Sequence, residues 1–231
     1  MNDIQKTDDE KSVLRWGGLA GMLGGIVFII MMITLLVLVP DPFAGPEELL
    51  MRFPDERATT YLGESLYVVA FILSVTLFLA LYRALRGTSL APALFGTGLA
   101  FLGFAVLGAG ALPNVGFAPI ADLYHAPGAT PGEQTALIPL WQATQGIFYE
   151  TDTVGFLLLM IGLVVLGVGM LGAPEFGRGF GWVSVVFGVV GIVGILLFPV
   201  DTLPFAAFAI LAYIIYPVLF GWKVYSLSRA P

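Results

Sequence analysis

Six apolar runs, each about as long as a lipid bilayer is thick, constrain this chain more than any other feature of its sequence. A helix needs roughly 20 apolar residues to cross a hydrocarbon core of about 30 Å. The connections between the runs are short and rich in proline, glycine and acidic residues. We therefore predict an all-α polytopic bundle of six transmembrane helices, over Leu14–Val39, Tyr61–Leu85, Leu90–Leu112, Trp141–Leu171, Gly179–Phe198 and Leu203–Trp222.

The composition points to the lipid bilayer as the partner of most of the surface. Hydrophobic residues make up 58% of the chain and charged residues only 11%, which is far from the usage of soluble domains. The net charge of -6 argues against a nucleic-acid partner, which requires a basic surface. The absence of cysteine excludes disulfides and thiolate sites, and no cofactor or metal motif is present. We expect no cofactor and no bound metal, and we favour a protein that is not an enzyme.

Lysine and arginine predict the orientation, because they are retained on the cytoplasmic side of membrane proteins. Only Arg52 and Arg57 fall on one side of the predicted topology, and the other eight of the ten basic residues fall on the opposite side. Both termini are therefore expected in the cytoplasm of a cell whose plasma membrane holds the protein. This gives cytoplasmic tails at residues 1–13 and 223–231, around a membrane domain at residues 14–222.

Two connections are predicted to form the outer face. Pro46 and the acidic residues after it are typical of a helix start, so we expect a short helix over Pro46–Phe53 with its apolar side chains on the membrane surface. The longest polar connection, Pro113–Pro139, is expected to be a loop.

The candidate site lies where polar residues lead directly into the fourth run. Glu150 and Asp152 are two residues apart, about 200° around a helix, so they cannot face one pocket. Asp152 shares its face with Gln145 and Tyr149, and Glu64 near the start of the second span could meet them. One interpretation is an outward-facing acidic cavity that binds a cation, a proton or an amine. The alternative is that the carboxylates are hydrated among lipid headgroups.

Glycines recur at helical spacing in the first, fourth and fifth runs. Small residues let helix backbones approach closely in lipid, where apolar burial gives helices little reason to associate. These faces could pack within one bundle, which we favour, or join this chain to a second copy or another protein. The glycines concerned are Gly17, Gly21, Gly25, Gly155, Gly162, Gly169 and Gly188.

Three passages carry a resemblance to a known family. They are GLAGMLGGIVFI over residues 18–29, ALYRAL over residues 80–85 and FGWV over residues 180–183. With these passages the chain resembles a family of prokaryotic six-span membrane proteins classed as a domain of unknown function. The resemblance extends over most of Leu14–Trp222 and implies a fold and a membrane location, but no activity.

Three functional hypotheses follow. The first is a membrane protein that binds or moves a small molecule or ion through the acidic outer cavity. The second is a non-catalytic scaffold or accessory subunit that assembles through its glycine faces. The third, an intramembrane enzyme, ranks last because the sequence offers no recognisable set of nucleophile, base and metal ligands.

Overall fold

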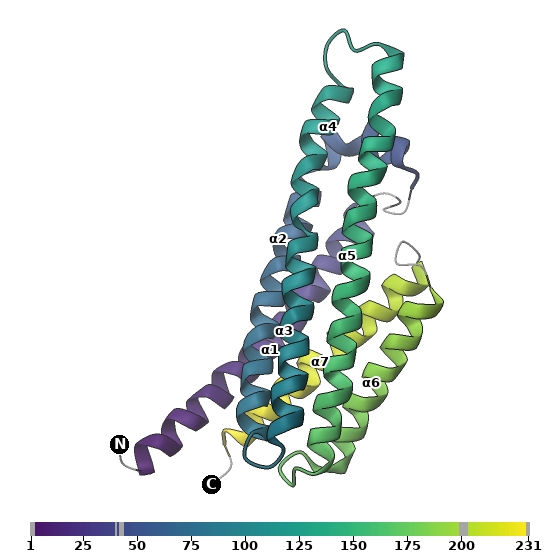
Figure 1. The fold of residues 1–231 in the computed structure, drawn as a ribbon. Helices are drawn as coiled ribbons and strands as arrows, with labels where there is room; N and C mark the ends of the chain where they lie inside the picture. Colours follow the sequence, from purple (N-terminus) through teal and green to yellow (C-terminus); the bar gives the residue numbers. More distant parts are fainter. Residues whose placement is uncertain (1–2, 40, 42–43, 199–202, 230–231) are drawn as a thin grey trace.

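The computed structural model describes residues 3–39, 41, 44–198 and 203–229, with the backbone alone at residues 3–7 and 203–212. Throughout this described part the chain is all-α, and it contains no strand (Figure 1). The elements are α1 (Asp3–Leu38), α2 (Pro46–Leu85), α3 (Leu90–Gly110), the 3-10 helix η1 (Leu112–Gly116), α4 (Phe117–Tyr124), α5 (Pro131–Leu171), α6 (Gly177–Leu197) and α7 (Leu203–Leu227).

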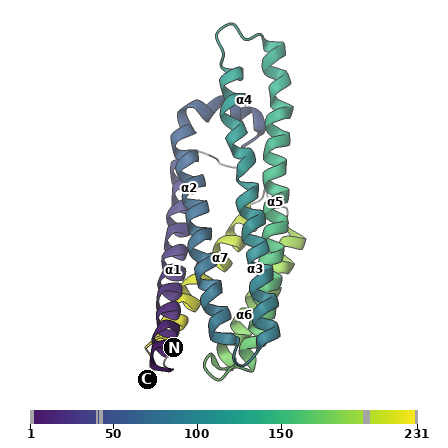
Figure 2. The same cartoon turned by 60° about the vertical axis from the view of Figure 1, so that its left-hand side comes forward.

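Five of these helical stretches are long and apolar enough to cross a membrane. α2 and α5 have 40 and 41 residues, which at 1.5 Å per residue is about 60 Å. That is about twice the thickness of a hydrocarbon core, so part of each helix must extend beyond it. α3 is prolonged by η1 and α4 beside α5, and together they project beyond the other helices (Figures 1 and 2). We call this projection the α4 end of the bundle.

The start of α5 differs from the predicted loop over Pro113–Pro139. That segment contains most of η1, all of α4 and the first turns of α5. Thr130 caps α5 by accepting a hydrogen bond from the Glu133 backbone N–H at 3.3 Å, and its own N–H donates to the Glu133 carboxylate at 2.8 Å. This reciprocal capping box starts a helix before the membrane-length run begins. Hydrogen bonds donated to the Glu133 carboxylate by the Thr130 backbone N–H and hydroxyl hold the pKa of Glu133 below its ordinary value.

The expected surface helix over Pro46–Phe53 also differs in the structure. This segment is the beginning of α2, whose first turns lie across the α4 end before the helix turns along the bundle (Figure 2). Pro54 inside the helix lacks a backbone donor, the usual cause of such a bend. Four apolar residues of this segment, at positions 49, 50, 51 and 53, were expected at the membrane surface. Leu50 and Phe53 are instead buried in protein contacts, and only Met51 is largely exposed.

A separate apolar core holds the α4 end together. Trp141 is stacked on Phe117 with ring centroids 4.3 Å apart and meets Phe53 edge-on at 5.3 Å. A tryptophan at a membrane boundary usually faces the lipid headgroups. Trp141 is instead buried in protein contacts. We call this set the cap cluster; it comprises Leu50, Phe53, Phe117, Ile120, Ala121, Tyr124 and Trp141.

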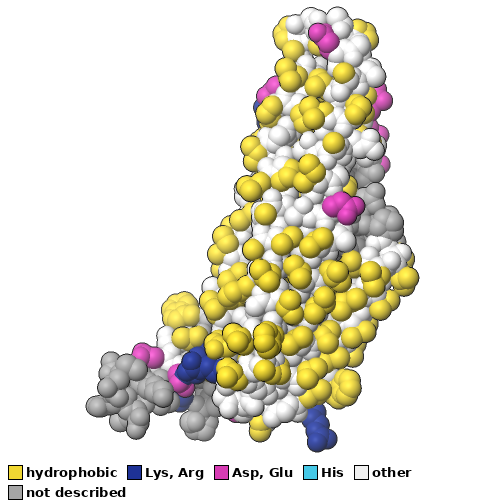
Figure 3. All heavy atoms as spheres, in the orientation of Figure 1, with side chains coloured by type: hydrophobic (Ala, Val, Ile, Leu, Met, Phe, Trp, Pro, Cys, Tyr) yellow, Lys and Arg dark blue, Asp and Glu magenta, His cyan; other side chains and the backbone are white. Residues whose placement is uncertain are grey.

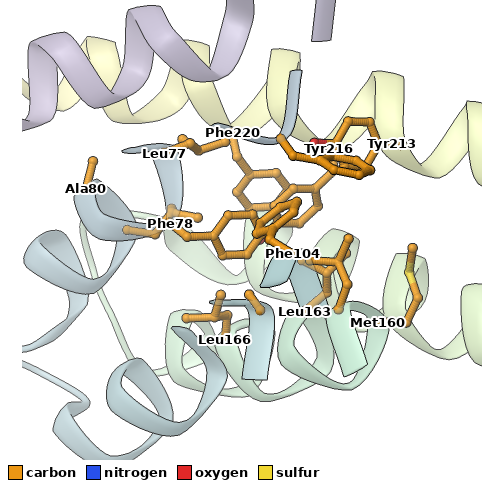
Figure 4. Packing of buried hydrophobic residues seen from close by; sticks show 14 of the residues in the cluster. Leu77, Phe78, Ala80, Phe104, Met160, Leu163, Leu166, Tyr213, Tyr216 and Phe220 are labelled. Atoms are coloured by element: carbon orange, nitrogen blue, oxygen red, sulfur yellow. The ribbon is translucent and has the colours of Figure 1, made fainter. Parts of the chain in front are cut away.

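The main core lies lower in the bundle, where α3 packs against α5, and α1 packs against α2 and α7. Aromatic side chains of α2, α3 and α7 pack together there (Figure 4). Tyr216 is stacked on Phe220 at 4.1 Å, and Phe78 meets Phe104 edge-on at 5.4 Å. Beside them lies an apolar cavity of about 10 Å³ between α2, α5 and α7.

The surface separates into an apolar wall and polar ends. Hydrophobic side chains cover most of the face in Figure 3, and the dark blue lysine and arginine side chains gather toward its lower end. The turns after α2 and α5, the beginning of α1 and the end of α7 all lie at this lower end (Figure 1). An ion pair between Arg83 and Glu10 joins α2 to α1 there.

Candidate functional site

The structure separates the two carboxylates of α5. Asp152 is buried, with 7% of its surface exposed, whereas Glu150 is exposed. Their positions on opposite sides of one helix follow from the spacing of two residues. Asp152 faces the bundle interior because its side of α5 also carries Gly155, Phe156 and Leu159, which are packed inside.

Tyr67 of α2 is the hydrogen-bond partner of Asp152. Its hydroxyl lies 2.9 Å from both carboxylate oxygens, so one O–H donor is shared between two acceptors. Both residues are buried, and aromatic rings surround the tyrosine: Phe71 at 4.2 Å, and Phe28 and Phe148 each at 6.4 Å. The carboxylate thus has a hydroxyl partner in an otherwise apolar setting.

Glu64 brings a second carboxyl group to the same region. It lies one turn from Tyr67 on α2, so the two side chains leave the helix on one face. The Asn114 side-chain amide of η1 donates to Glu64 Oε1 at 2.7 Å. Asp152 accepts the hydrogen bond of Tyr67, and Glu64 lies one turn before Tyr67 on α2, so the two carboxyl groups are neighbours of one tyrosine. Two acidic side chains from two helices therefore lie on either side of Tyr67, near the α4 end.

Two polar atoms in this cluster have no hydrogen-bond partner among the described residues. They are Glu64 Oε2 and Asn114 Oδ1, and both are buried. No ion pair joins Glu64 or Asp152 to a lysine or arginine in the part of the chain that the structure describes. Arg57, two turns before Glu64, instead pairs with Asp122 of α4. We call Glu64, Tyr67, Asn114 and Asp152 the acidic cluster.

Gln145 and Tyr149 lie on α5 between Asp152 and the cap cluster. The Gln145 amide donates to the Tyr149 hydroxyl at 3.0 Å, and both side chains are half-buried. Their position follows the predicted face of α5. They extend the polar lining of the helix toward the α4 end.

Sequence reasoning singled out Glu64 and Asp152 but missed their partners Tyr67 and Asn114. Tyr67 could have been noticed, because it lies one turn after Glu64 within an apolar run. Asn114 gave no such signal, since it lies in the segment predicted to be a loop. Its contact with Glu64 spans 50 positions in the chain and depends on the fold.

A second polar layer lies deeper in the bundle. The Tyr213 hydroxyl of α7 donates to Ser74 at 2.7 Å, and Ser184 of α6 donates to the Leu163 carbonyl at 2.7 Å. These hydroxyls have partners and serve helix contacts. For a metal, the described residues contain no group of three or more histidine, cysteine, aspartate or glutamate side chains that could hold an ion.

The predicted packing glycines all lie at contacts between helices of this chain. A Cβ on Gly17 or Gly21 would meet α2, and one on Gly25 would meet Val218 of α7. Glycines 155, 162 and 169 face α3, and glycine 188 faces α5. Some of these approaches involve backbone, as where a Cβ on Gly162 would lie 2.8 Å from the Gly96 carbonyl oxygen. Each of the seven positions is thus used for packing within the bundle.

Comparison of the chain with protein families, with curated proteins and with solved structures gave no match. The resemblance to a six-span family therefore stays a prediction.

Proposed function

We propose that the chain is an integral membrane protein that binds a small cation at the acidic cluster. The cation could be a proton, a metal ion or a protonated amine. The observation that supports this proposal is that buried Asp152 and half-buried Glu64 lie on either side of Tyr67 without a basic partner among the described residues. A buried charge is costly unless it is compensated, and a bound cation supplies that compensation.

The membrane arrangement is the second part of the proposal. The five membrane-length stretches are joined by α7, whose 25 residues give the sixth span. Both termini lie in the cytoplasm of a cell bounded by this plasma membrane, because most lysines and arginines gather at the end where α1 begins and α7 ends. The acidic cluster, near the α4 end, then lies toward the outer side of the membrane.

The distribution of charge supports entry of a cation from the outer side. The α4 end carries exposed acidic side chains, among them Glu47, Glu48 and Asp122. Its two arginines, Arg52 and Arg57, are both in ion pairs with carboxylates. A negative surface raises the local concentration of cations. Such a site would serve the passage of the cation across the bilayer.

The alternative function, a scaffold that assembles through glycine faces, receives less support. The glycines on which it depends already contact neighbouring helices of the same chain. An oligomer would therefore need a different surface.

The test is the thermal unfolding of the purified protein in detergent, measured across a series of pH values and with sodium, potassium, magnesium, calcium and ammonium salts. A ligand at 100 times its Kd stabilises the folded state by about 2.7 kcal/mol. We expect at least one cation, the proton included, to raise the unfolding temperature of the parent protein. Glu64→Gln should lose that response, and Asp152→Asn should reduce it.

Glu150→Gln is the matched control, because it removes a carboxylate from the same helix at an exposed position. It should respond to cations as the parent does. The proposal fails if Asp152→Asn and Glu64→Gln keep the full response, or if the parent protein responds to none of these cations.

A further inference from the structure

The side chains of Glu64 and Asn114 share one hydrogen bond, and each has a second polar atom without a partner among the described residues. Asn114 Nδ2 donates to Glu64 Oε1 at 2.7 Å. The remaining oxygens, Glu64 Oε2 and Asn114 Oδ1, are both buried and both lack a partner among the described residues. An ionised carboxylate and an amide oxygen can only accept hydrogen bonds, so they cannot satisfy each other. Buried acceptors without donors are rare and costly.

We infer that the cation of the acidic cluster is a proton, held on Glu64 in a paired ring with the Asn114 amide. This inference rests on the proposed function and specifies its ligand. A proton on Oε2 creates an O–H group that can donate to Asn114 Oδ1. One proton then satisfies both unpartnered oxygens, and the two side chains share a pair of antiparallel hydrogen bonds.

The inference does not depend on which way the Asn114 amide is oriented. The oxygen and nitrogen of an amide are assigned from the hydrogen bonds around them. In the opposite orientation Asn114 Oδ1 would lie 2.7 Å from Glu64 Oε1. Two oxygens at that distance need a hydrogen between them, so this arrangement also requires a protonated carboxyl group.

The groups around Glu64 favour a neutral acid at this position. Asp152 approaches from α5, and ionised Glu64 would repel it. Tyr67 on α2 donates its hydroxyl to Asp152, Tyr149 lies further along α5, and Tyr213 on α7 donates to Ser74 in the deeper polar layer. η1 contributes the uncharged Asn114, and Arg57 is engaged with Asp122. Asp201 lies outside the described residues.

A metal ion suits these residues less well than a proton. Calcium and magnesium require six or more oxygen ligands in a defined arrangement. The described residues contain no group of three acidic, histidine or cysteine side chains at one place. A proton needs only the one carboxyl oxygen and the one amide oxygen that are unpartnered.

The test is infrared difference spectroscopy of the purified protein in detergent as pH is changed. The parent protein should show the carbonyl stretch of a protonated carboxylic acid at neutral pH, and that band should disappear on alkaline titration. Glu64→Gln should lack the band, and Asp152→Asn and Glu150→Gln should retain it. Asn114→Leu should shift the band to a higher frequency, because the acid loses its hydrogen-bonding partner.

Glu64→Gln also serves as a test of folding. Its amide N–H replaces the acid O–H, so it should unfold at the temperature of the parent protein at neutral pH and lose the parent's response to alkaline pH. The inference is overturned if the parent shows no carboxylic-acid band, if Glu64→Gln retains it, or if only Asp152→Asn removes it. Stabilisation by a metal or ammonium salt without that band would overturn the proton assignment and leave cation binding itself intact.

Discussion

At the residue scale, the acidic cluster shows that position on a helix matters more than residue type. Glu150 and Asp152 are both carboxylates at nearly the same depth in α5, yet one is exposed and the other is buried. The buried one has a single described hydroxyl donor, from Tyr67, for its two oxygens. Loss of the Tyr67 hydroxyl would therefore remove the one side-chain donor that the described residues give Asp152.

Tyr67→Phe should destabilise the protein by about 1–3 kcal/mol, because it removes that donor and leaves a buried acceptor unpaired. The aromatic ring and its contacts with Phe71 and Phe28 are retained. The measurement is the free energy of unfolding in mixed detergent micelles.

Tyr61→Phe provides the control for Tyr67→Phe, since Tyr61 lies on the same helix and is 38% exposed. It should change stability by less than about 0.5 kcal/mol, as is usual for surface positions. Equal effects of the two substitutions would contradict the role assigned to Tyr67. A combined Tyr67→Phe and Asp152→Asn variant should recover part of the loss, since it also removes the carboxylate that Tyr67→Phe leaves without its donor.

At the element scale, the helices are placed by glycines that permit close backbone contact. α3 and α5 approach each other at Gly96 and Gly162, and again at Gly103 and Gly155. In lipid such contacts replace the apolar burial that joins helices in water. This pairing carries η1, and with it Asn114, to Glu64 of α2.

Gly162→Ala should destabilise the bundle by about 1–3 kcal/mol through overpacking. The added Cβ would lie 2.8 Å from the Gly96 carbonyl oxygen and 3.0 Å from the Ala100 nitrogen, and backbone cannot move aside easily. Gly146→Ala on the same helix is the control, because its Cβ would meet nothing within 4 Å. It should stabilise α5 by about 0.5–1 kcal/mol through helix propensity. The two variants are compared by their thermal unfolding temperatures. If Gly162→Ala unfolds at or above the temperature of Gly146→Ala, this account of the contact is wrong.

At the scale of the whole molecule, the proposed orientation decides which side of the membrane the acidic cluster serves. The turn after α2 and the connection before α5 lie at opposite ends of the bundle (Figure 1). The chain contains no cysteine, so one introduced thiol is an unambiguous reporter. Gly87 and Gly132 suit this use, because a Cβ at either position meets nothing within 4 Å.

Gly132→Cys should react with a membrane-impermeant maleimide added to intact cells, and Gly87→Cys should react only after the membrane is opened. The reason is the excess of lysine and arginine at the end that holds Gly87. Modification is measured by a mass shift on gel electrophoresis. The reverse pattern would place the acidic cluster toward the cytoplasm and contradict the proposed entry from outside.

The sequence by itself was enough to predict an all-α protein with membrane-length helices, because apolar length and composition act locally along the chain. It also predicted that Glu150 and Asp152 would face opposite sides, since helical spacing alone decides that. Only the tertiary structure decided that Glu64 and Asp152 lie on either side of Tyr67, which bonds Asp152. It also placed Asn114 against Glu64 and buried Trp141 in the cap cluster. Those contacts join residues far apart in the chain, and they depend on how glycine-lined helices pack, which no local pattern specifies. The helix start at Thr130 is an intermediate case: its capping box is visible in the sequence, but the prolines and glycines around it favoured a loop.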